Sequence, residues 1–280
     1  RIDYGDDEWT SLVFYGTPPL EELMYKRADF IRKNQQVKDP NDPVQYSFRS
    51  WDNGFGRLVD NEMDPGLGTI DIGGSDDRCF APPLFLSAKN IIFPAQDEID
   101  ALDDFVEKFL YGKLQDKDTF TVKTSLLDSH ETYEACKGTK AFEQLERFLI
   151  KDDDGNESQW RDWSYHTRPY NYPHTYNIYF NMYRIAKFSG CNTSRAATEY
   201  LLFAFRTAMA LYLDSTYEGN ITYRGYSNFE QGNFSESHAP LGSFGLPDIL
   251  KALEDEGMGK ERTELFEMIK KRSKHFVSEE

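Results

Sequence analysis

The residues best suited to chemistry lie in a run, residues 160–174, that contains no Leu, Ile, Val, Met or Phe. It reads WRDWSYHTRPYNYPH and mixes Trp and Tyr with Arg, Asp, Asn and His. Large aromatic rings need something to pack against, and their polar tips need a hydrogen-bond partner when buried. A sugar meets both needs, because its ring face stacks on aromatics and its hydroxyls bond to polar groups. We interpret the run as a candidate carbohydrate site; an aromatic connection that packs onto helices is the alternative.

The same run supplies most of the predicted site. Asp162 lies between two Trp residues, where desolvation would raise the pKa of its carboxyl. His166 and His174 are candidate proton-transfer groups, although His174 also suits a first-turn helix position with a local hydrogen bond. The expected substrate-binding residues of the run are Trp160, Trp163, Arg168, Tyr170, Asn171 and Tyr172.

Two further long loops are expected, at residues 45–78 and 215–242, and irregular connections of this length are often functional. The first offers Trp51 as a stacking platform and places Asp76 and Asp77 directly after a Gly-Gly-Ser turn. The second offers Glu230 as a partner carboxylate. Glycosidic cleavage needs two carboxyl groups, one protonated and one acting as base or nucleophile. Solvated turns, helix caps and surface charge are the alternatives for each.

Composition narrows the class of ligand. The net charge is −16, with an isoelectric point near 4.8, which disfavours nucleic acid and anionic membrane surfaces as partners. Aromatic residues make up 15% of the chain, which fits ring-lined grooves for a neutral or weakly charged glycan. The three cysteines have no metal-ligand spacing, the Asp-rich loop lacks EF-hand order, and nucleotide or zinc-peptidase motifs are missing. We therefore predict no metal and no cofactor.

Apolar spacing predicts a mostly α-helical chain with a few short strands. Gly112 is expected to end the helix of residues 94–110, and residues 119–124 alternate like a strand. The pattern favours one helical domain over 1–280, built of antiparallel helix pairs of the α/α-toroid type. The helices are expected at residues 20–31, 83–90, 94–110, 141–150, 176–188, 194–214, 247–256 and 260–276, with a hairpin in 159–165.

Two features favour a secreted or extracellular protein, periplasmic if bacterial. Four Asn-x-Ser/Thr sequons occur, at Asn156, Asn192, Asn220 and Asn233, more than the one or two expected by chance. The sequence opens Arg-Ile-Asp-Tyr without Met, which predicts an excised piece of a longer, processed chain. Other domains of that parent chain are then expected partners, together with an oligo- or polysaccharide.

The order WDNGFGR, GGSDD, PPLFLSAKN, FPAQDEIDALDDFV and RPYNYPHTYNIYFNMYRIAK resembles an uncharacterised family of large secreted bacterial and fungal proteins. These proteins are taken to be carbohydrate-active enzymes of the α/α-toroid kind. The resemblance spans most of the chain and is most specific at residues 168–174. It implies a helical fold, secretion and polysaccharide processing, and it assigns no catalytic residue.

The function predicted first is glycoside hydrolysis by paired carboxylates. A polysaccharide lyase that uses Tyr, His, Asn and Arg of the aromatic run is the second hypothesis, and a non-catalytic glycan-binding or scaffold domain is the third. The products separate them: a lyase leaves unsaturated ends, a hydrolase leaves only new reducing ends, and a binding domain leaves the glycan intact.

Overall fold

The computed structural model describes residues 2–42, 44–59, 77–122, 171–213 and 245–278 of the chain. This part is mostly helical with a few short strands, which confirms the predicted class. The helices are α1 (Leu20–Phe30), η1 (Ile31–Gln35), α2 (Asp77–Ile92), α3 (Gln96–Phe105), η3 (Val106–Leu114), α6 (Asn171–Phe188), α7 (Ala197–Leu213), α9 (Leu246–Asp255) and α10 (Gly259–Ser278), of which η1 and η3 are π-helical. The strands are β1 (Ile2–Gly5), β2 (Glu8–Thr10), β3 (Trp51–Asp52) and β4 (Arg57–Leu58).

One continuous core joins these helices, because each turns an apolar stripe towards its neighbours. The stripe of α3 and η3 follows helical spacing, and its side chains are almost completely buried. Tyrosines of α6 fill much of the opposite side of this core. The residues concerned are Ile99, Leu102, Phe105, Val106, Phe109, Tyr172, Tyr176 and Tyr179.

Contacts along the helices fix their relative directions. The ring of Phe80 in α2 stacks on His174 in α6, with centroids 5.5 Å apart. About two helical turns further towards the C-terminus of both helices, Asn181 Nδ2 donates to Ser87 Oγ at 3.0 Å. The same number of residues separates the two contacts on each helix, so α2 and α6 run parallel. Helices α6 and α9 are also parallel, since Gly245 approaches Asn177 while Tyr183 Oη donates to Glu256 at 2.8 Å near the other end.

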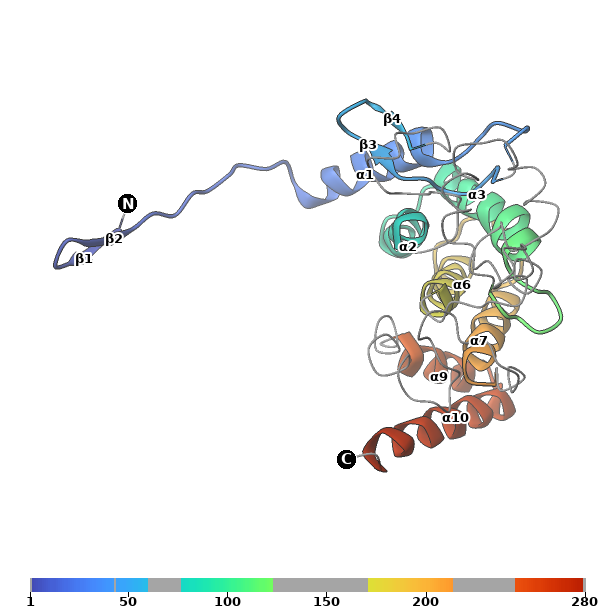
Figure 1. Cartoon of the computed structure of the whole chain (residues 1–280). Helices are drawn as coiled ribbons and strands as arrows, with labels where there is room; N and C mark the ends of the chain where they lie inside the picture. The colour runs from blue at the N-terminus through green and yellow to red at the C-terminus, as the bar shows by residue number, and fades with distance from the viewer. Residues whose placement is uncertain (1, 43, 60–76, 123–170, 214–244, 279–280) are drawn as a thin grey trace, which may run out of the picture.

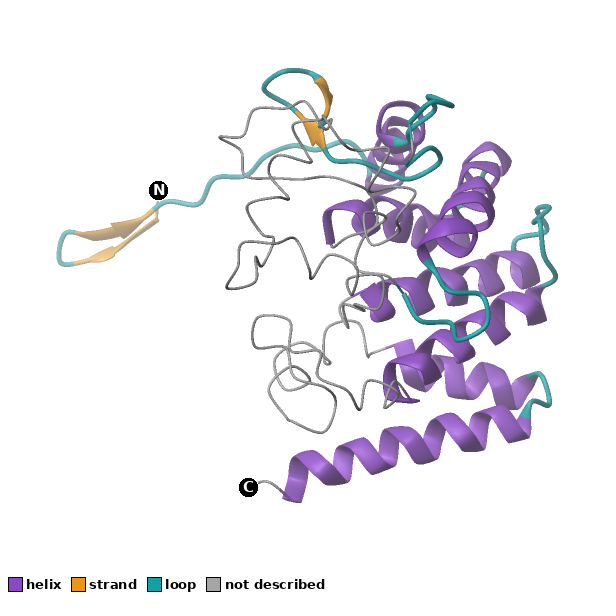
Figure 2. Ribbon diagram, turned by 45° about the vertical axis from the view of Figure 1, so that its right-hand side comes forward, coloured by secondary structure: helices purple, strands orange, loops and turns teal. Residues whose placement is uncertain are grey.

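The remaining helices run the opposite way. Arg32 of η1 pairs with Asp97 at 3.1 Å, and the next turn places Gln36 Nε2 2.9 Å from the carbonyl of Ala101. The chain through α1 and η1 is therefore parallel to α3. Polar contacts from α3 and η3 to α7 show the same parallel sense, as described below. Figure 2 shows α6, α7, α9 and α10 as a stack of neighbouring helices.

Among the described residues, the short connections consequently lie at one end of the helices: they are residues 93–95, 189–196 and 256–258. The chain leaves and re-enters the described helices at the other end around residues 36–76, 115–170 and 214–245, much of which lies outside the described residues. We call the second end the loop-bearing end. It consists of the C-terminal turns of η1, η3 and α7 and the N-terminal turns of α2, α6 and α9.

A buried ion pair joins α2 to α3. Lys89 Nζ donates to Glu98 Oε2 at 2.8 Å, and Asn90 Nδ2 donates to the same oxygen at 2.8 Å. The Lys89 side chain has no exposed surface, and its ammonium also lies 4.3 Å from the ring centroid of Tyr25 in α1. Lys89 thereby ties three helices together, and its removal would leave the Glu98 carboxylate buried without its cation.

We expect Lys89→Met to lower the free energy of unfolding by about 3–5 kcal/mol, the usual cost of removing one partner of a buried pair. Urea denaturation followed by circular dichroism measures this change. Lys26→Met is the matched control, because the pair of Lys26 with Glu22 is an exposed contact one turn apart and contributes little. Equal stability of the two variants would contradict the prediction.

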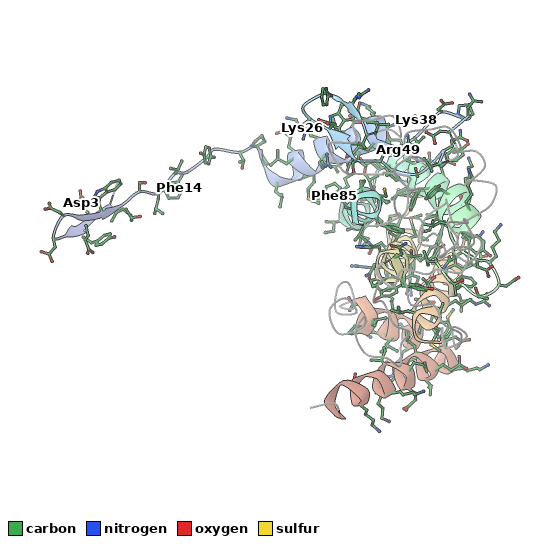
Figure 3. The ribbon with its side chains drawn as sticks, viewed as in Figure 1. Asp3, Phe14, Lys26, Lys38, Arg49 and Phe85 are labelled. Atoms are coloured by element: carbon green, nitrogen blue, oxygen red, sulfur yellow. The ribbon has the colours of Figure 1, made fainter. Side chains whose placement is uncertain are left out.

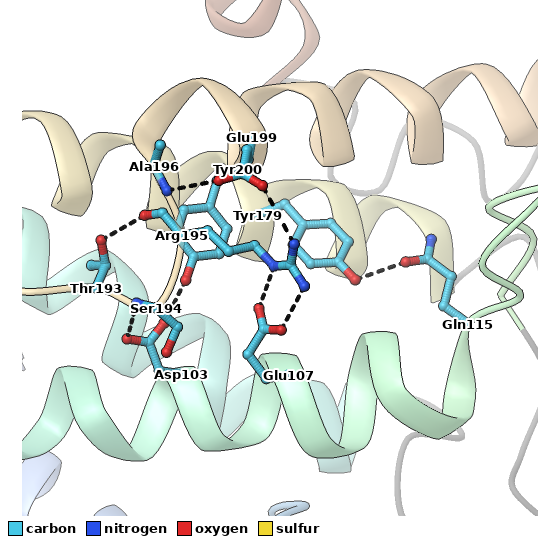
Figure 4. A network of polar contacts seen from close by, with 10 residues as sticks. All are labelled: Asp103, Glu107, Gln115, Tyr179, Thr193, Ser194, Arg195, Ala196, Glu199 and Tyr200. Atoms are coloured by element: carbon cyan, nitrogen blue, oxygen red, sulfur yellow. Dashed lines mark hydrogen bonds and ion pairs between the residues drawn. The ribbon is translucent and has the colours of Figure 1, made fainter.

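A second polar network, drawn in Figure 4, connects α3 and η3 to α6 and α7. Arg195 binds Glu107 through two nitrogens at 2.5 and 2.6 Å, and Tyr200 Oη donates to Asp103 Oδ1 at 2.5 Å. Burial raises the pKa of the Asp103 carboxyl, although hydrogen bonds from Tyr200 and Ser194 oppose this. Burial and the adjacent Asp103 raise the pKa of Tyr200 further, so its hydroxyl stays protonated and keeps donating.

Gln115 completes this network beyond the end of η3. Its Nε2 donates to Thr207 Oγ1 at 2.8 Å, while its Oε1 accepts from Tyr179 Oη at 2.7 Å. A single buried amide therefore contacts both α6 and α7. Like the bonds of Arg195 to Glu107 and of Tyr200 to Asp103, its contacts join the helix pair of α2 and α3–η3 to the pair of α6 and α7. We call these contacts, from Asp103 to Gln115, the α3–α7 seam.

The prediction that Gly112 ends its helix is wrong. The chain continues through Gly112 to Leu114 as the π-helix η3. In this wider turn a Cβ on Gly112 would lie 2.6 Å from the carbonyl oxygen of Glu107. A glycine is needed here because the backbone at residue 112 lies so close to the Glu107 carbonyl that a side chain would not fit. Gly112 therefore continues the helix rather than ending it.

Other boundaries also differ from the predictions. Helix α2 begins at Asp77, so the expected loop of residues 45–78 ends earlier, and it contains the unpredicted hairpin of β3 and β4. Helix α6 begins at Asn171 rather than Tyr176. Within the described residues the expected strand at 119–124 is reduced to one bridge between Gln115 and Val122. The helix predicted at 141–150 and the hairpin in 159–165 lie outside the described residues.

The N-terminal residues form an arm that projects from the helices (Figure 1). Its tip is the antiparallel hairpin of β1 and β2, and the following residues are extended. Figure 3 shows Asp3 and Phe14 on this arm, well away from Lys26 and Phe85. Phe14 and Tyr15 are 87% and 84% exposed, so the arm contributes nothing to the core.

Candidate functional site

His174 is a predicted site residue that the structure places at the loop-bearing end. It lies in the first turn of α6 and is partly exposed. Its ring is stacked on Phe80 of α2 at an interplanar angle of 14°. Because α2 and α6 are parallel, this contact holds the imidazole at the N-terminal ends of both helices. The arrangement keeps His174 both ordered and accessible, as proton transfer requires.

Asn171 and Tyr172 lie beside His174 but are buried, with exposures of 0% and 1%. Their positions suit packing of the first turn of α6, which is the alternative considered for the aromatic run. Asp77 is the first residue of α2, so its backbone also lies at the loop-bearing end. The other predicted residues of the three loops lie outside the described residues: Asp76, Trp160, Asp162, Trp163, His166, Arg168, Tyr170 and Glu230.

Trp51, the remaining predicted residue, is presented by the hairpin of β3 and β4. Asp52 Oδ1 accepts hydrogen bonds from the amides of Gly54 and Phe55 at 2.6 and 3.1 Å, which fixes the turn. Trp51 itself packs edge-to-face on Phe30, with ring centroids 5.2 Å apart and an interplanar angle of 85°. The hairpin therefore holds the indole against the end of α1.

A cavity of about 420 Å³ lies beside Trp51, within the size range of small-molecule sites. We call it the Trp51 pocket. Ile31 and Gln35 of η1 form one wall, the Trp51 hairpin a second, and Pro82 and Phe85 of α2 a third. Since η1 ends and α2 begins at the loop-bearing end, the pocket lies on the flank of that end.

Gln35 is the polar residue of the pocket that the sequence did not suggest. Its side chain is 3% exposed, and its Nε2 donates to the carbonyl of Arg49 at 2.9 Å. That bond fixes the orientation of the amide, because a carbonyl can only accept. The covered Oε1 accepts no hydrogen bond from the described residues. A lone Gln in a helix carries no sequence signal for such an arrangement.

Arg27 and Asn53 complete the polar part of the lining. The Arg27 guanidinium lies 5.6 Å from the ring centroid of Phe30, and the described residues include no ion-pair partner for it. Phe80, which orients His174, was also not predicted. A Phe in a Cys-Phe-Ala-Pro-Pro sequence is what an ordinary core residue would be. Its contact with His174 depends on α6, which lies far along the chain.

The described residues contain no cluster of three His, Cys, Asp or Glu side chains that could hold a metal ion. None of the described helices is long and apolar enough to cross a membrane.

Gly245, just before α9, controls how closely α9 approaches the loop-bearing end of α6. A Cβ there would lie 2.0 Å from Asn177 Oδ1, and the Asn177 amide is held by a 2.8 Å bond from Nδ2 to the carbonyl of Pro173. We expect Gly245→Ala to lower the free energy of unfolding by about 1–3 kcal/mol, as overpacking does.

Gly259→Ala, at the start of α10, is the control in the same urea titration. A Cβ at Gly259 meets nothing within 4 Å, so this variant should keep or slightly raise the stability. An equally stable Gly245→Ala would mean that α9 does not depend on this contact.

Comparison with known proteins bears first on the fold. A solved structure of a polysaccharide lyase superposes with a TM-score of 0.57 and 18% sequence identity, over 94% of this chain. The chain spans 29% of the length of that lyase. No curated protein matches the sequence. A family model described as a family of unknown function, DUF5695, matches residues 1–280, and the chain therefore belongs to this family.

Proposed function

We propose that this chain forms a domain of the α/α-toroid type that processes a polysaccharide, with its active site at the loop-bearing end. The observation that carries the proposal is that the short turns between described helices lie at one end, whereas the chain leaves and re-enters these helices three times at the other end. Catalytic residues commonly lie on loops held by a rigid scaffold. The likeness of fold to a polysaccharide lyase supports the same class of substrate.

Among the possible reactions we favour β-elimination. A base removes the proton next to the carboxyl group of a uronate residue. The electron pair forms a carbon–carbon double bond as the glycosidic C–O bond breaks, and the leaving oxygen takes up a proton. His174 is the described residue that can accept the proton, because it is accessible and oriented by Phe80. Arg168, Tyr170 and His166 are the proposed partners, for charge neutralisation and proton transfer.

Hydrolysis by two carboxylates is the second candidate. Asp77 is the residue that favours it, since its backbone lies at the loop-bearing end. Asp76, Asp162 and Glu230 would supply the partner carboxylate. We propose that both reactions would take place outside the cell: elimination would act on a glycan that contains uronate, and hydrolysis on a neutral or weakly charged glycan.

Product analysis tests the proposal. The chain is incubated with uronate-containing and neutral polysaccharides, and both ultraviolet-absorbing unsaturated ends and new reducing ends are measured. Elimination predicts that the two increase together. Reducing ends without unsaturation would establish hydrolysis instead. Binding of a glycan without any turnover would identify a non-catalytic binding domain and contradict the catalytic proposal.

We expect His174→Gln to lower kcat by about 100-fold or more, the usual contribution of a general base, with little change in melting temperature. Phe188→Ala is the matched control, because Phe188 is exposed at the opposite end of the same helix. Steady-state rates of the two variants are compared with the unmodified chain. Full turnover by His174→Gln would exclude this histidine as the base.

A further inference from the structure

We infer that the Trp51 pocket is a subsite that binds one hydroxyl-bearing pyranose residue of the polysaccharide, at a distance from the bond that is broken. The inference rests on the proposed function and adds a binding position to it. It follows from three properties of the pocket within the described residues: a covered acceptor without a donor, an aromatic wall and a cation without a carboxylate partner.

The unused acceptor is Gln35 Oε1. One N–H of the Gln35 amide donates to the carbonyl of Arg49, and Oε1, which can only accept, has no donor among the described residues. A carboxylate or phosphate has no proton to offer it, whereas a sugar hydroxyl does. A buried acceptor without a donor costs about 1–3 kcal/mol, so a hydroxyl placed there removes an existing penalty. Because Oε1 is covered, the contact requires a small movement of the pocket wall.

The remaining walls match the two faces of a sugar ring. Trp51 offers an aromatic surface, and its edge-to-face contact with Phe30 keeps the indole from turning. The half-buried Phe85 and the exposed Ala81 supply apolar surface for the C–H groups of the ring. A pocket that combines apolar walls with a few placed polar groups is typical of small-molecule sites.

Arg27 supplies the donors that complement the Gln35 acceptor. The described residues give it no carboxylate partner, so its guanidinium is available to ring and hydroxyl oxygens. The pocket contains one cation in a chain of net charge −16. That balance favours a neutral sugar over a polyanionic stretch, and a neutral residue next to a uronate satisfies both this pocket and the proposed elimination.

The test uses the whole chain labelled with 5-fluorotryptophan, whose Trp51 resonance is assigned with Trp51→Phe. The probes are cellohexaose, mannohexaose, laminarihexaose and maltohexaose as neutral ligands, with hexagalacturonate and hexamannuronate as acidic ones. At least one neutral hexaose is expected to shift the Trp51 resonance in a saturable way. Calorimetry on the same ligand gives the Kd for each variant.

Three variants with matched controls locate the binding. Trp51→Ala should raise the Kd by about tenfold or more, whereas Phe55→Ala, an exposed aromatic on the same hairpin but outside the pocket, should leave it unchanged. Gln35→Met should weaken binding several-fold. Gln36→Met should not, although Gln36 loses an equivalent bond to a backbone carbonyl.

The third comparison is between Arg27→Met, which should raise the Kd, and Lys26→Met, which should not. Lys26 lies beside Arg27 on α1 but outside the pocket. A hexaose that binds with the Trp51 resonance unmoved and all three Kd values unchanged would overturn the subsite while leaving the proposed function intact. Binding of the hexauronates alone, dependent on Arg27, would overturn the assignment to a neutral sugar. If no hexaose binds and no polysaccharide is degraded, both proposals fail.

Discussion

The α3–α7 seam is the interaction on which the rest of the structure depends. Apolar helix faces hold two helix pairs together but tolerate a shift along the helix axis, because one row of side chains resembles the next. The bidentate bond of Arg195 to Glu107 and the bond of Tyr200 to Asp103 have fixed geometry and are satisfied in one register only. That register brings the ends of η3 and α7 level with the start of α6.

The same register positions the described residues of the candidate site. His174 is positioned by Phe80 only because α2 and α6 start at the same level. The Trp51 pocket depends on α2 in the same way, through Pro82 and Phe85. Lys89 extends this order to α1, since its buried ammonium contacts both Glu98 and the ring of Tyr25. Charged groups buried between the helices thus determine where the residues of the candidate site lie.

Local periodicity was enough to predict most helices but not their ends. The stripe from Ile99 to Leu110 gave a correct helix, whereas Gly112 was misread, because the π-turn that needs it arises from packing and has no sequence period. The start of α6 at Asn171 was missed for a related reason: its first turn is held by tertiary burial of Asn171 and Tyr172 rather than by a conventional apolar stripe.

For the site, residue type alone pointed to Trp51 and His174, and their roles stay predictions. Residue type could not reveal Gln35 or Arg27. Their relevance comes from what is absent around them in space, a donor for Gln35 Oε1 and, within the described residues, a carboxylate for Arg27. Whether a polar group lacks a partner depends on which residues surround it in the folded structure, so it can be recognised only once the positions of the helices are known.

The separation of short and long connections has a consequence for how such a chain changes over generations. An insertion in the exposed turn of the β3–β4 hairpin, residues 53–56, is expected to alter the flank of the loop-bearing end without displacing a helix of the frame. The tight turns at residues 93–95 and 256–258 leave no such freedom, since Phe93 and Met258 already bond back to the helices before them. Under the proposed function, substrate preference and structural integrity depend on different stretches of the chain, and selection can act on one while sparing the other.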